Sequence, residues 1–325
     1  MANKLKELFP MIQSREQVYE NIHRSAMLSE SFYEWKKEQQ EEFLDFVTGA
    51  KGIKITYDCF FKEVMNPEYT PERLEHFLTV LFGCKVKISV VLPNDSTRIA
   101  DEVSLLITDI VIELEDGSLA DIEIQKIGYA FPGQRNSCYS SDLLLRQYKR
   151  ARTEKKKDFS FRDIKPVYTI ILYESSPKEL KNNEGQYIHR SIDGFDTGVK
   201  VENMQKTILI SLDIFKKSTQ NRDINNELDA WLAFFSYDSP EKIWELIGKY
   251  EKFKAMYQDL YNICMNMERV INMFSEELRI LDRNTVKLMI EDLQNELEMA
   301  LKEREDMQKE NELLKRMLEE KTEKR

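Results

Sequence analysis

The sequence predicts a mixed α/β protein whose central sheet is flanked by helices, followed by an entirely helical C-terminal region. Apolar runs with strand-like alternation are interleaved with segments of helical spacing up to about residue 222, as in a mixed α/β core. From residue 225 the strand signals stop and a heptad pattern follows. The predicted parts are an N-terminal helical segment (1–50), a core domain (51–222), a helical region packing on the core (223–280) and a coiled-coil tail (281–325).

The N-terminal segment is predicted to be amphipathic. Residues 15–48 are rich in Glu, Lys and Gln and have the spacing of one or two helices. Glycines at positions 49 and 52 mark a break after them. Four aromatic residues, in two pairs three positions apart, are the core candidates of this segment: Phe32, Trp35, Phe43 and Phe46.

The core domain is predicted to open with two helices and a strand. The first helix carries Asp58 and Lys62, which share a face because they lie four residues apart. The same spacing also fits an ordinary ion pair between successive turns. Residues 71–82 form the second predicted helix, with Thr70 as its N-cap, and residues 86–91 alternate like a strand.

A β-hairpin is predicted over residues 109–125. Its two alternating runs are joined by Glu115-Asp116-Gly117, and an Asp-Gly pair between alternating runs is a strong hairpin signal. A three-residue loop with the glycine in the left-handed conformation pairs Leu114 with Ser118. Counting back in that register places Asp109 opposite Glu123 on one face, with Cβ atoms about 5 Å apart.

The register decides whether these two acids meet. A two-residue loop would put Asp109 and Glu123 on opposite faces of the hairpin. If they share a face they repel each other, and a divalent cation with oxygen ligands would offset that cost. The alternative is a solvated hairpin face, although the other face is strongly apolar, with Ile110, Ile112, Leu114, Ile122 and Ile124.

These motifs together resemble the PD-(D/E)xK nuclease superfamily, and within it the transposase-like branch related to recombination-promoting nucleases. That branch has an Asp, a hairpin with a Gly at its turn, and Glu-x-Gln where most of the superfamily has Glu-x-Lys. The resemblance covers roughly residues 50–240. The matching residues are Asp109, Gly117, Glu123 and Gln125, preceded by Asp58-Cys59-Phe60-Phe61-Lys62 and followed by Arg135, Tyr139 and the strand that starts near Lys165.

The resemblance implies a fold and a site. The fold would be a restriction-endonuclease-like core, with a four-stranded mixed sheet flanked by helices. Asp109 and Glu123 would bind Mg²⁺ or Mn²⁺ with help from the Ile124 carbonyl, and the metal would activate water. Gln125 would orient water or phosphate, because an amide cannot act as a base. Asp58 would be an accessory acid, Lys62 a phosphate contact, and Arg135 and Tyr139 would lie beside the scissile phosphate.

Positive charge is concentrated after the hairpin. Residues 135–165 contain ten Lys and Arg against four acids, whereas the whole chain has a net charge of −10. Such a local excess suits a surface that follows phosphates, although it also fits a solvated helix end. A helix is predicted over residues 135–152. Its candidate DNA-contacting residues are Arg135, Tyr139, Arg146, Lys149 and Arg150.

Two buried strands and a helical region are predicted downstream. Residues 167–173 and 207–215 are apolar enough for buried strands, and residues 178–201 are expected to be irregular and exposed. The aromatic residues that follow position 225 could pack against the core. An aromatic stripe at helical spacing is more often core than a ligand site.

The tail has the pattern of a coiled coil. Apolar residues recur at alternating steps of four and three for more than four heptads, with Glu and Lys on the other faces. A coiled coil would most simply make a homodimer, whereas the alternative is a long solvated single helix. The seam positions are Val286, Ile290, Leu293, Leu297, Ala300, Arg304, Met307, Asn311, Leu314 and Leu318.

Composition narrows the class of protein. The four cysteines are far apart and the three histidines are scattered, so neither a zinc site nor a disulfide framework is indicated. No apolar run reaches the length of a membrane span, and a cytoplasmic location is expected. Within these limits, the resemblance to the PD-(D/E)xK transposase-like branch implies a Mg²⁺-dependent DNA endonuclease, with a role in recombination or mobile-element processing. The alternative is a catalytically degenerate nuclease fold serving as a DNA-binding or coiled-coil interaction module.

Overall fold

The computed structural model describes residues 4–92, 109–128, 132–183, 185–220 and 222–323. Its contacts divide the chain into two compact units, residues 1–279 and 280–325. The finer division at residues 50, 222 and 280 stays a prediction. Residues 129–131, between the predicted hairpin and the helix predicted over residues 135–152, lie outside the described residues.

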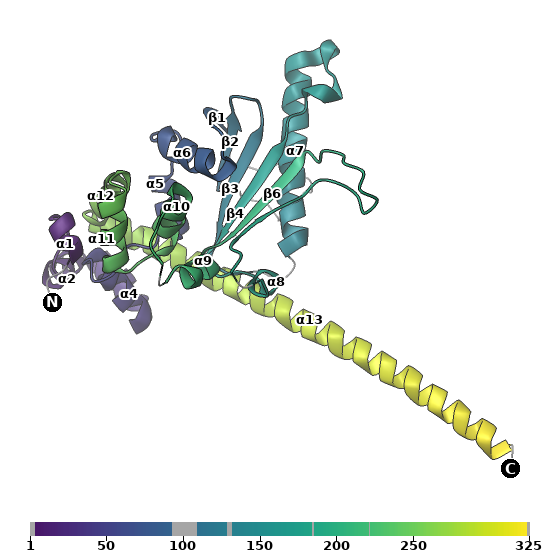
Figure 1. Ribbon diagram of the computed structural model, residues 1–325. Coiled ribbons are helices and arrows are strands. Elements are labelled where there is room, and N and C mark those ends of the chain that lie inside the picture. The colour runs from purple at the N-terminus through teal and green to yellow at the C-terminus, as the bar shows by residue number, and fades with distance from the viewer. Residues whose placement is uncertain (1–3, 93–108, 129–131, 184, 221, 324–325) are drawn as a thin grey trace. The chain divides into compact units, whose positions relative to one another are not determined.

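A six-stranded mixed sheet forms the centre of the first unit (Figure 1), which confirms the predicted fold class. The strand order is β1-β2-β3-β4-β6-β5, two strands more than the four that the resemblance implied. The pairs β3–β4 and β4–β6 are parallel and the others antiparallel. The strands are β1 (Ile88–Leu92), β2 (Ile110–Leu114), β3 (Leu119–Gln125), β4 (Val167–Tyr173), β5 (Ile188–Arg190) and β6 (Gln205–Ser211).

The two faces of the sheet are covered by different helices (Figure 1). One face contributes Ile112, Ile122 and Ile170 to the main core, together with α5 (Asp58–Val64), α6 (Pro71–Phe82), α9 (Leu212–Ser218) and α10 (Glu227–Ser236). On the other face, Val111 and Val167 pack in a small cluster with Leu143, which belongs to α7 (Pro132–Lys155).

Two predictions for the region after β4 were wrong. Residues 178–201 contain α8 (Lys178–Lys181) and β5, a strand of three residues that is too short to give an alternation signal. The strand predicted over 207–215 ends at Ser211, and α9 begins at the next residue. An apolar run of this length does not distinguish a buried strand from a buried helix.

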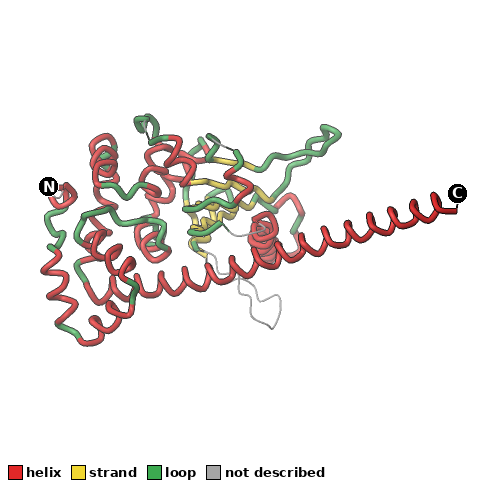
Figure 2. The backbone as a smooth tube through the Cα atoms, turned by 90° about the horizontal axis from the view of Figure 1, so that it is seen from below, coloured by secondary structure: helices red, strands yellow, loops and turns green. Residues whose placement is uncertain are grey.

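The N-terminal helices lie to one side of the sheet (Figure 2). The expectation of one or two helices over residues 15–48 was wrong, because three form there. Ser25 starts a new helix by accepting a hydrogen bond from the Leu28 backbone, and Trp35 is extended before the next one. The helices are α1 (Lys4–Leu8), α2 (Arg15–His23), α3 (Ala26–Glu34) and α4 (Lys37–Val47).

The first two helices of the core domain form as predicted, although one cap differs. Thr70 occupies the N-cap position of α6, but its side chain makes no capping bond. Its hydroxyl instead donates to the carbonyl oxygens of Val64 and Asn66. The bond to Val64 ties the start of α6 to the end of α5.

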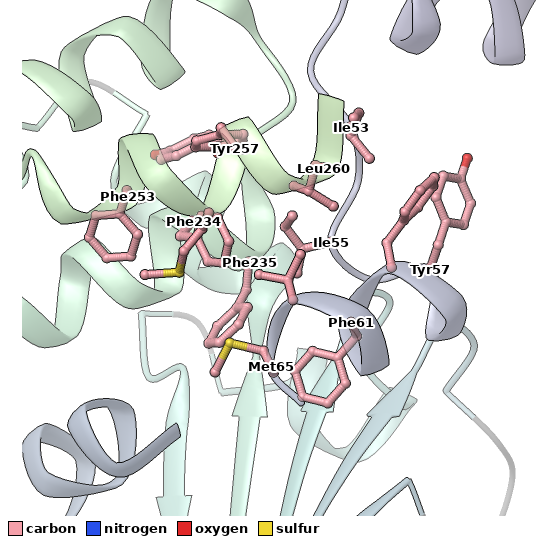
Figure 3. Close-up of a cluster of buried hydrophobic side chains, with 14 of the residues drawn as sticks. Ile53, Ile55, Tyr57, Phe61, Met65, Phe234, Phe235, Phe253, Tyr257 and Leu260 are labelled. Atoms are coloured by element: carbon pink, nitrogen blue, oxygen red, sulfur yellow. The ribbon is translucent and has the colours of Figure 1, made fainter. Parts of the chain in front are cut away.

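An aromatic core joins the C-terminal helices to the core domain (Figure 3). The helices are α10, α11 (Pro240–Lys249), α12 (Lys252–Cys264) and the first turns of α13 (Met267–Glu323). Phe61 and Phe77 of the core domain each pack against Phe235 of α10, with ring centroids 6.1 and 5.2 Å apart. Trp231 packs against Phe253 of α12 at 5.1 Å. Most of the predicted aromatic stripe is therefore core, although Trp244 of α11 is 40% exposed.

Helix α13 is one helix of 57 residues. Its first turns bury Val270, Ile271 and Phe274. In the second unit, Val286, Ile290, Leu293, Leu297 and Met307 are all at least half exposed. The side chains of Leu314 and Leu318 lie outside the described residues, and the coiled coil stays a prediction. No helix in the described part of the chain is long and apolar enough to cross a membrane.

Candidate active site

The hairpin has the predicted register. The Leu114 N–H donates to the Ser118 carbonyl at 2.9 Å, and Gly117 is left-handed with φ 83°. Within the ladder, Ile110 pairs with Ile122 and Val111 with Asp121. The next pair outward in this register is Asp109 with Glu123. The three-residue loop therefore brings the two acids to facing positions, as expected.

Asp109 and Glu123 hold each other through the backbone. The Asp109 N–H donates to Glu123 Oε1 at 3.0 Å, and the Ile124 N–H donates to Asp109 Oδ2 at 2.8 Å. Each carboxylate is thus fixed by a peptide group next to the other. Charge-assisted bonds of this kind are stronger than neutral ones, so both side chains are preorganised at the end of the hairpin.

A third carboxylate, which the sequence reasoning did not assign to the site, lies beside them. Asp121 is one pleat before Glu123 on β3 and only 1% exposed. Both of its oxygens are buried and accept no hydrogen bond from the described residues. A buried carboxylate without donors is costly. The signal was the alternation of Asp121, Glu123 and Gln125, although alternation alone does not distinguish a buried acid from a solvated one.

Burial and mutual repulsion raise the pKa values of all three carboxyl groups. Burial, followed by the charge of Asp58, raises the pKa of Asp109 to about 7. Burial and the neighbouring Asp109 raise the pKa of Asp121 well above its ordinary value. Burial and then Asp121 do the same for Glu123. Positive charge would relieve this concentration of carboxylates.

One lysine supplies part of that positive charge. Lys62 Nζ lies 3.1 Å from Asp109 Oδ1 and 2.8 Å from Asp58 Oδ2. Burial opposes the charge on this lysine, yet Asp109 and Asp58 raise its pKa above the ordinary value. Asp58 and Lys62 do form the i,i+4 ion pair that the sequence allowed. The structure also joins that pair to Asp109.

The N-terminus of helix α5, which carries Asp58 and Lys62, is capped by the side chain of Glu277 of α13. The residue before the helix, Tyr57, provides no side-chain cap, and Glu277 Oε2 instead accepts from the Asp58 N–H at 2.9 Å. Glu277 Oε1 lies 2.9 Å from Lys126 Nζ, directly after Gln125 in the chain. One buried carboxylate therefore fixes both α5 and the end of β3. Sequence reasoning missed it.

Gln125, Arg135 and Tyr139 lie on the α7 side of the sheet. Gln125 is buried on the same face of β3 as Glu123, and its Nε2 makes no hydrogen bond with the described residues. Arg135 Nη2 donates to the Tyr139 hydroxyl at 2.9 Å. Burial and then Glu123 raise the pKa of Tyr139, so its hydroxyl stays protonated as a donor.

The remaining predicted DNA contacts are arranged unevenly. Arg146 is mostly buried and pairs with Asp142 at 2.8 Å. Arg150 is half-buried and bonds to Glu113 of β2. Lys149 is exposed. The structure thus uses Arg146 and Arg150 partly to hold α7 in place, and their contact with DNA stays a prediction.

The donor chemistry of this cluster fits a hard divalent cation. Carboxylate oxygens are the ligands that Mg²⁺ prefers, and it commonly takes only one or two of them. Across the residues that the structure describes, no group of three or more His, Cys, Asp or Glu side chains could hold a metal ion. A site here would therefore rest on Asp109 and Glu123, completed by backbone oxygen and water.

One comparison with known proteins gives a match. A family model described as PD-(D/E)XK nuclease family transposase matches residues 55–289. The matched region contains the hairpin, Asp58, Lys62, helix α7 and Glu277. No curated protein and no solved structure matches the chain.

Proposed function

Because the chain belongs to the PD-(D/E)XK nuclease family of transposases, we propose that it is a metal-dependent endonuclease that hydrolyses phosphodiester bonds of DNA. The observation that carries this proposal is the facing pair Asp109 and Glu123, locked by bonds of 3.0 and 2.8 Å between each carboxylate and the opposite backbone. DNA processing in recombination or by mobile elements is the biological setting that we propose.

Asp109 and Glu123, with the Ile124 carbonyl, would hold Mg²⁺ or Mn²⁺. When bound, such an ion supplies an activated water and stabilises the leaving oxygen. The concentration of buried carboxylates supports this assignment, because their pKa values are raised by burial and by one another. A cation that enters would offset this repulsion.

The surrounding residues would orient phosphate and water. Lys62 contacts Asp109 and lies within the carboxylate cluster, so its ammonium group would provide the fixed charge that an amide at position 125 cannot. Gln125 Nε2 is buried and makes no hydrogen bond to any described residue, so it could donate to a phosphate or water oxygen. Arg135 and Tyr139 would add donors from α7.

The exposed heptad side of α13 supports a homodimer as the working form. Leu293 and Leu297 are more than half exposed, although seam residues of this kind are buried in coiled coils. Glutamates recur at the positions just before Leu297, Arg304 and Asn311. An antiparallel pair would place these glutamates against each other, so we favour a parallel dimer. Leu293→Asp should give monomers in sedimentation equilibrium, whereas Met299→Asp, off the seam, should not.

A non-catalytic role is the second candidate. It is favoured by Gln125 standing where most of the superfamily has Lys, and by hydrogen bonds or ion pairs already made by both Asp109 carboxylate oxygens. In that case the fold would bind DNA or partners without cleaving.

The direct test is plasmid cleavage by the purified full chain with Mg²⁺ or Mn²⁺. The double variant Asp109→Asn/Glu123→Gln keeps the side-chain volumes and should show only background cleavage. Glu115→Gln, an exposed acid of the same hairpin, is the matched control and should cleave as wild type does. Equal cleavage by the double variant and wild type would refute the site, and no cleavage by wild type would favour the second candidate.

A further inference from the structure

Helix α7 continues past the sheet and ends in a compact turn, residues 155–165, here called the α7 tip (Figure 1). The tip contains two short 3₁₀ turns, Lys156–Asp158 and Phe161–Asp163. Phe159 packs edge-on between Tyr148 of α7 and Phe161, with ring centroids 5.6 Å apart in both pairs. This ring contact anchors the tip to the helix.

Local hydrogen bonds fix the shape of the α7 tip. Ser160 caps the second turn, because its N–H donates to Asp163 Oδ2 at 2.7 Å and its hydroxyl oxygen accepts from the Arg162 N–H at 3.4 Å. Lys156 is left-handed with φ 47°, which reverses the chain. The exposed side chains therefore project from a defined backbone.

The α7 tip and the last turns of α7 carry excess positive charge. Residues 149–165 contain eight Lys and Arg and three acids, a net charge of +5 in a chain of −10. Of the acids, Glu154 lies 3.8 Å from Arg150, and Asp163 serves the cap. Within the described residues, Lys155, Lys156 and Lys157 take part in no ion pair. Their charge is available to a ligand.

The α7 tip also carries an exposed aromatic ring, that of Phe161. Phe161 is 77% exposed. Arg162 follows it directly in the chain, and Lys157 precedes it by four residues. A single exposed aromatic residue is ordinary by itself. Lysines with an exposed ring on an ordered support form a combination suited to nucleic acid, in which phosphates meet the cations and bases or sugars meet the ring.

The α7 tip also lies in reach of the candidate active site along the same helix. Tyr139 lies two turns from the start of α7, and Lys155 is the last residue of that helix. From Tyr139 to Lys155 the helix rises about 24 Å, which corresponds to about seven base pairs of duplex at 3.4 Å each. One duplex of modest length could contact both the candidate active site and the α7 tip.

We propose that the α7 tip is a second DNA-binding site, in which its lysines contact phosphates and Phe161 packs against bases or sugars about seven base pairs from the scissile phosphate. The ligand class rests on the proposed function, because a nuclease brings duplex DNA to the hairpin. The tip sets how the duplex lies along α7. It takes no part in the chemistry.

The test measures binding of a fluorescent 24-base-pair duplex to the full chain in EDTA, at several salt concentrations. Lys156→Gln/Lys157→Gln should weaken binding. It should also make the negative slope of log K against log salt less steep by about 2, because about one ion contact is lost with each lysine. Phe161→Ala should weaken binding roughly five- to hundred-fold with an unchanged slope. The matched controls are Lys178→Gln/Lys181→Gln and Tyr69→Ala, an aromatic residue 81% exposed elsewhere, and both should bind as wild type does.

The outcomes separate this proposal from the proposed function. If the tip variants bind DNA as tightly as their controls, the α7 tip is not a DNA-binding site, whatever the cleavage assay shows. If they bind more weakly while wild type fails to cleave with Mg²⁺ or Mn²⁺, the tip proposal stands and the nuclease proposal falls. Circular dichroism melts of each variant would establish that weaker binding is not loss of fold.

Discussion

The carboxylate cluster of the hairpin and the aromatic core of the C-terminal helices are both buried, yet they are opposite in character. Trp231 is fully buried, contacts four phenylalanine rings and donates its indole N–H to His76 at 2.8 Å. Asp121 is buried next to two other acids and accepts no hydrogen bond from the part of the chain that the structure describes. Apolar burial stabilises a fold, whereas clustered buried carboxylates destabilise it. The comparison teaches that the aromatic core stabilises the fold, whereas the hairpin cluster costs stability that the divalent cation we propose would offset.

The largest expected effect is in the aromatic core. Trp231→Ala should lower the free energy of unfolding by about 3–5 kcal/mol, because it removes a large buried ring and leaves a cavity. Urea denaturation followed by circular dichroism measures this change. A loss below about 1 kcal/mol would show that the ring contacts contribute little, and it would contradict the claim that the aromatic core stabilises the fold.

Substitution of Glu277 should have the next largest effect on the free energy of unfolding. This residue belongs to α13 and contacts Asp58 and Lys126, which lie beside the carboxylate cluster. Glu277→Gln keeps an acceptor for the Asp58 N–H but leaves Lys126 buried without its partner, which should cost about 3 kcal/mol of unfolding free energy. Lys126→Met in the same chain should recover most of that loss in the same denaturation assay. If the double variant is no more stable than Glu277→Gln, loss of the Glu277–Lys126 ion pair is not the cause of the destabilisation.

Much of the first region could be predicted from sequence, because its geometry is local. A Gly in a three-residue loop and period-two alternation set the register, and the register sets which acids face each other. Glu277 could not be found in this way. It lies between the buried residues Phe274 and Leu278 of a long helix, and its partners are more than 150 residues away. Only the packing of α13 brings them together.

Asp121 gives the prediction with the opposite sign. Asp121→Asn should stabilise the metal-free protein by about 1–2 kcal/mol, because an amide of the same shape removes a buried charge and can donate to neighbouring carboxylates. Thermal unfolding in EDTA checks this, with the exposed Asp158→Asn as a control expected within about 0.5 kcal/mol of wild type. Destabilisation by Asp121→Asn would mean that this carboxylate already has a stabilising partner.

The smallest expected effect is a pH dependence in the aromatic core. Burial, followed by the charge of Lys252, lowers the pKa of His76. The folded state therefore binds fewer protons than the unfolded chain just below pH 6.5, and stability falls as the pH drops through that window. His76→Gln keeps an acceptor for Trp231 and does not titrate. The stability difference between wild type and this variant should decrease as the pH falls from 7.5 to 5.5, and a constant difference would contradict this reading.

Calorimetric titration of the full chain with Mn²⁺ most directly tests whether Asp109 and Glu123 together hold a divalent cation. Wild type and Glu115→Gln should bind with the same heat, and Asp109→Asn and Glu123→Gln should each abolish it. Undiminished Mn²⁺ binding in both site variants, or no binding by wild type, would contradict the account.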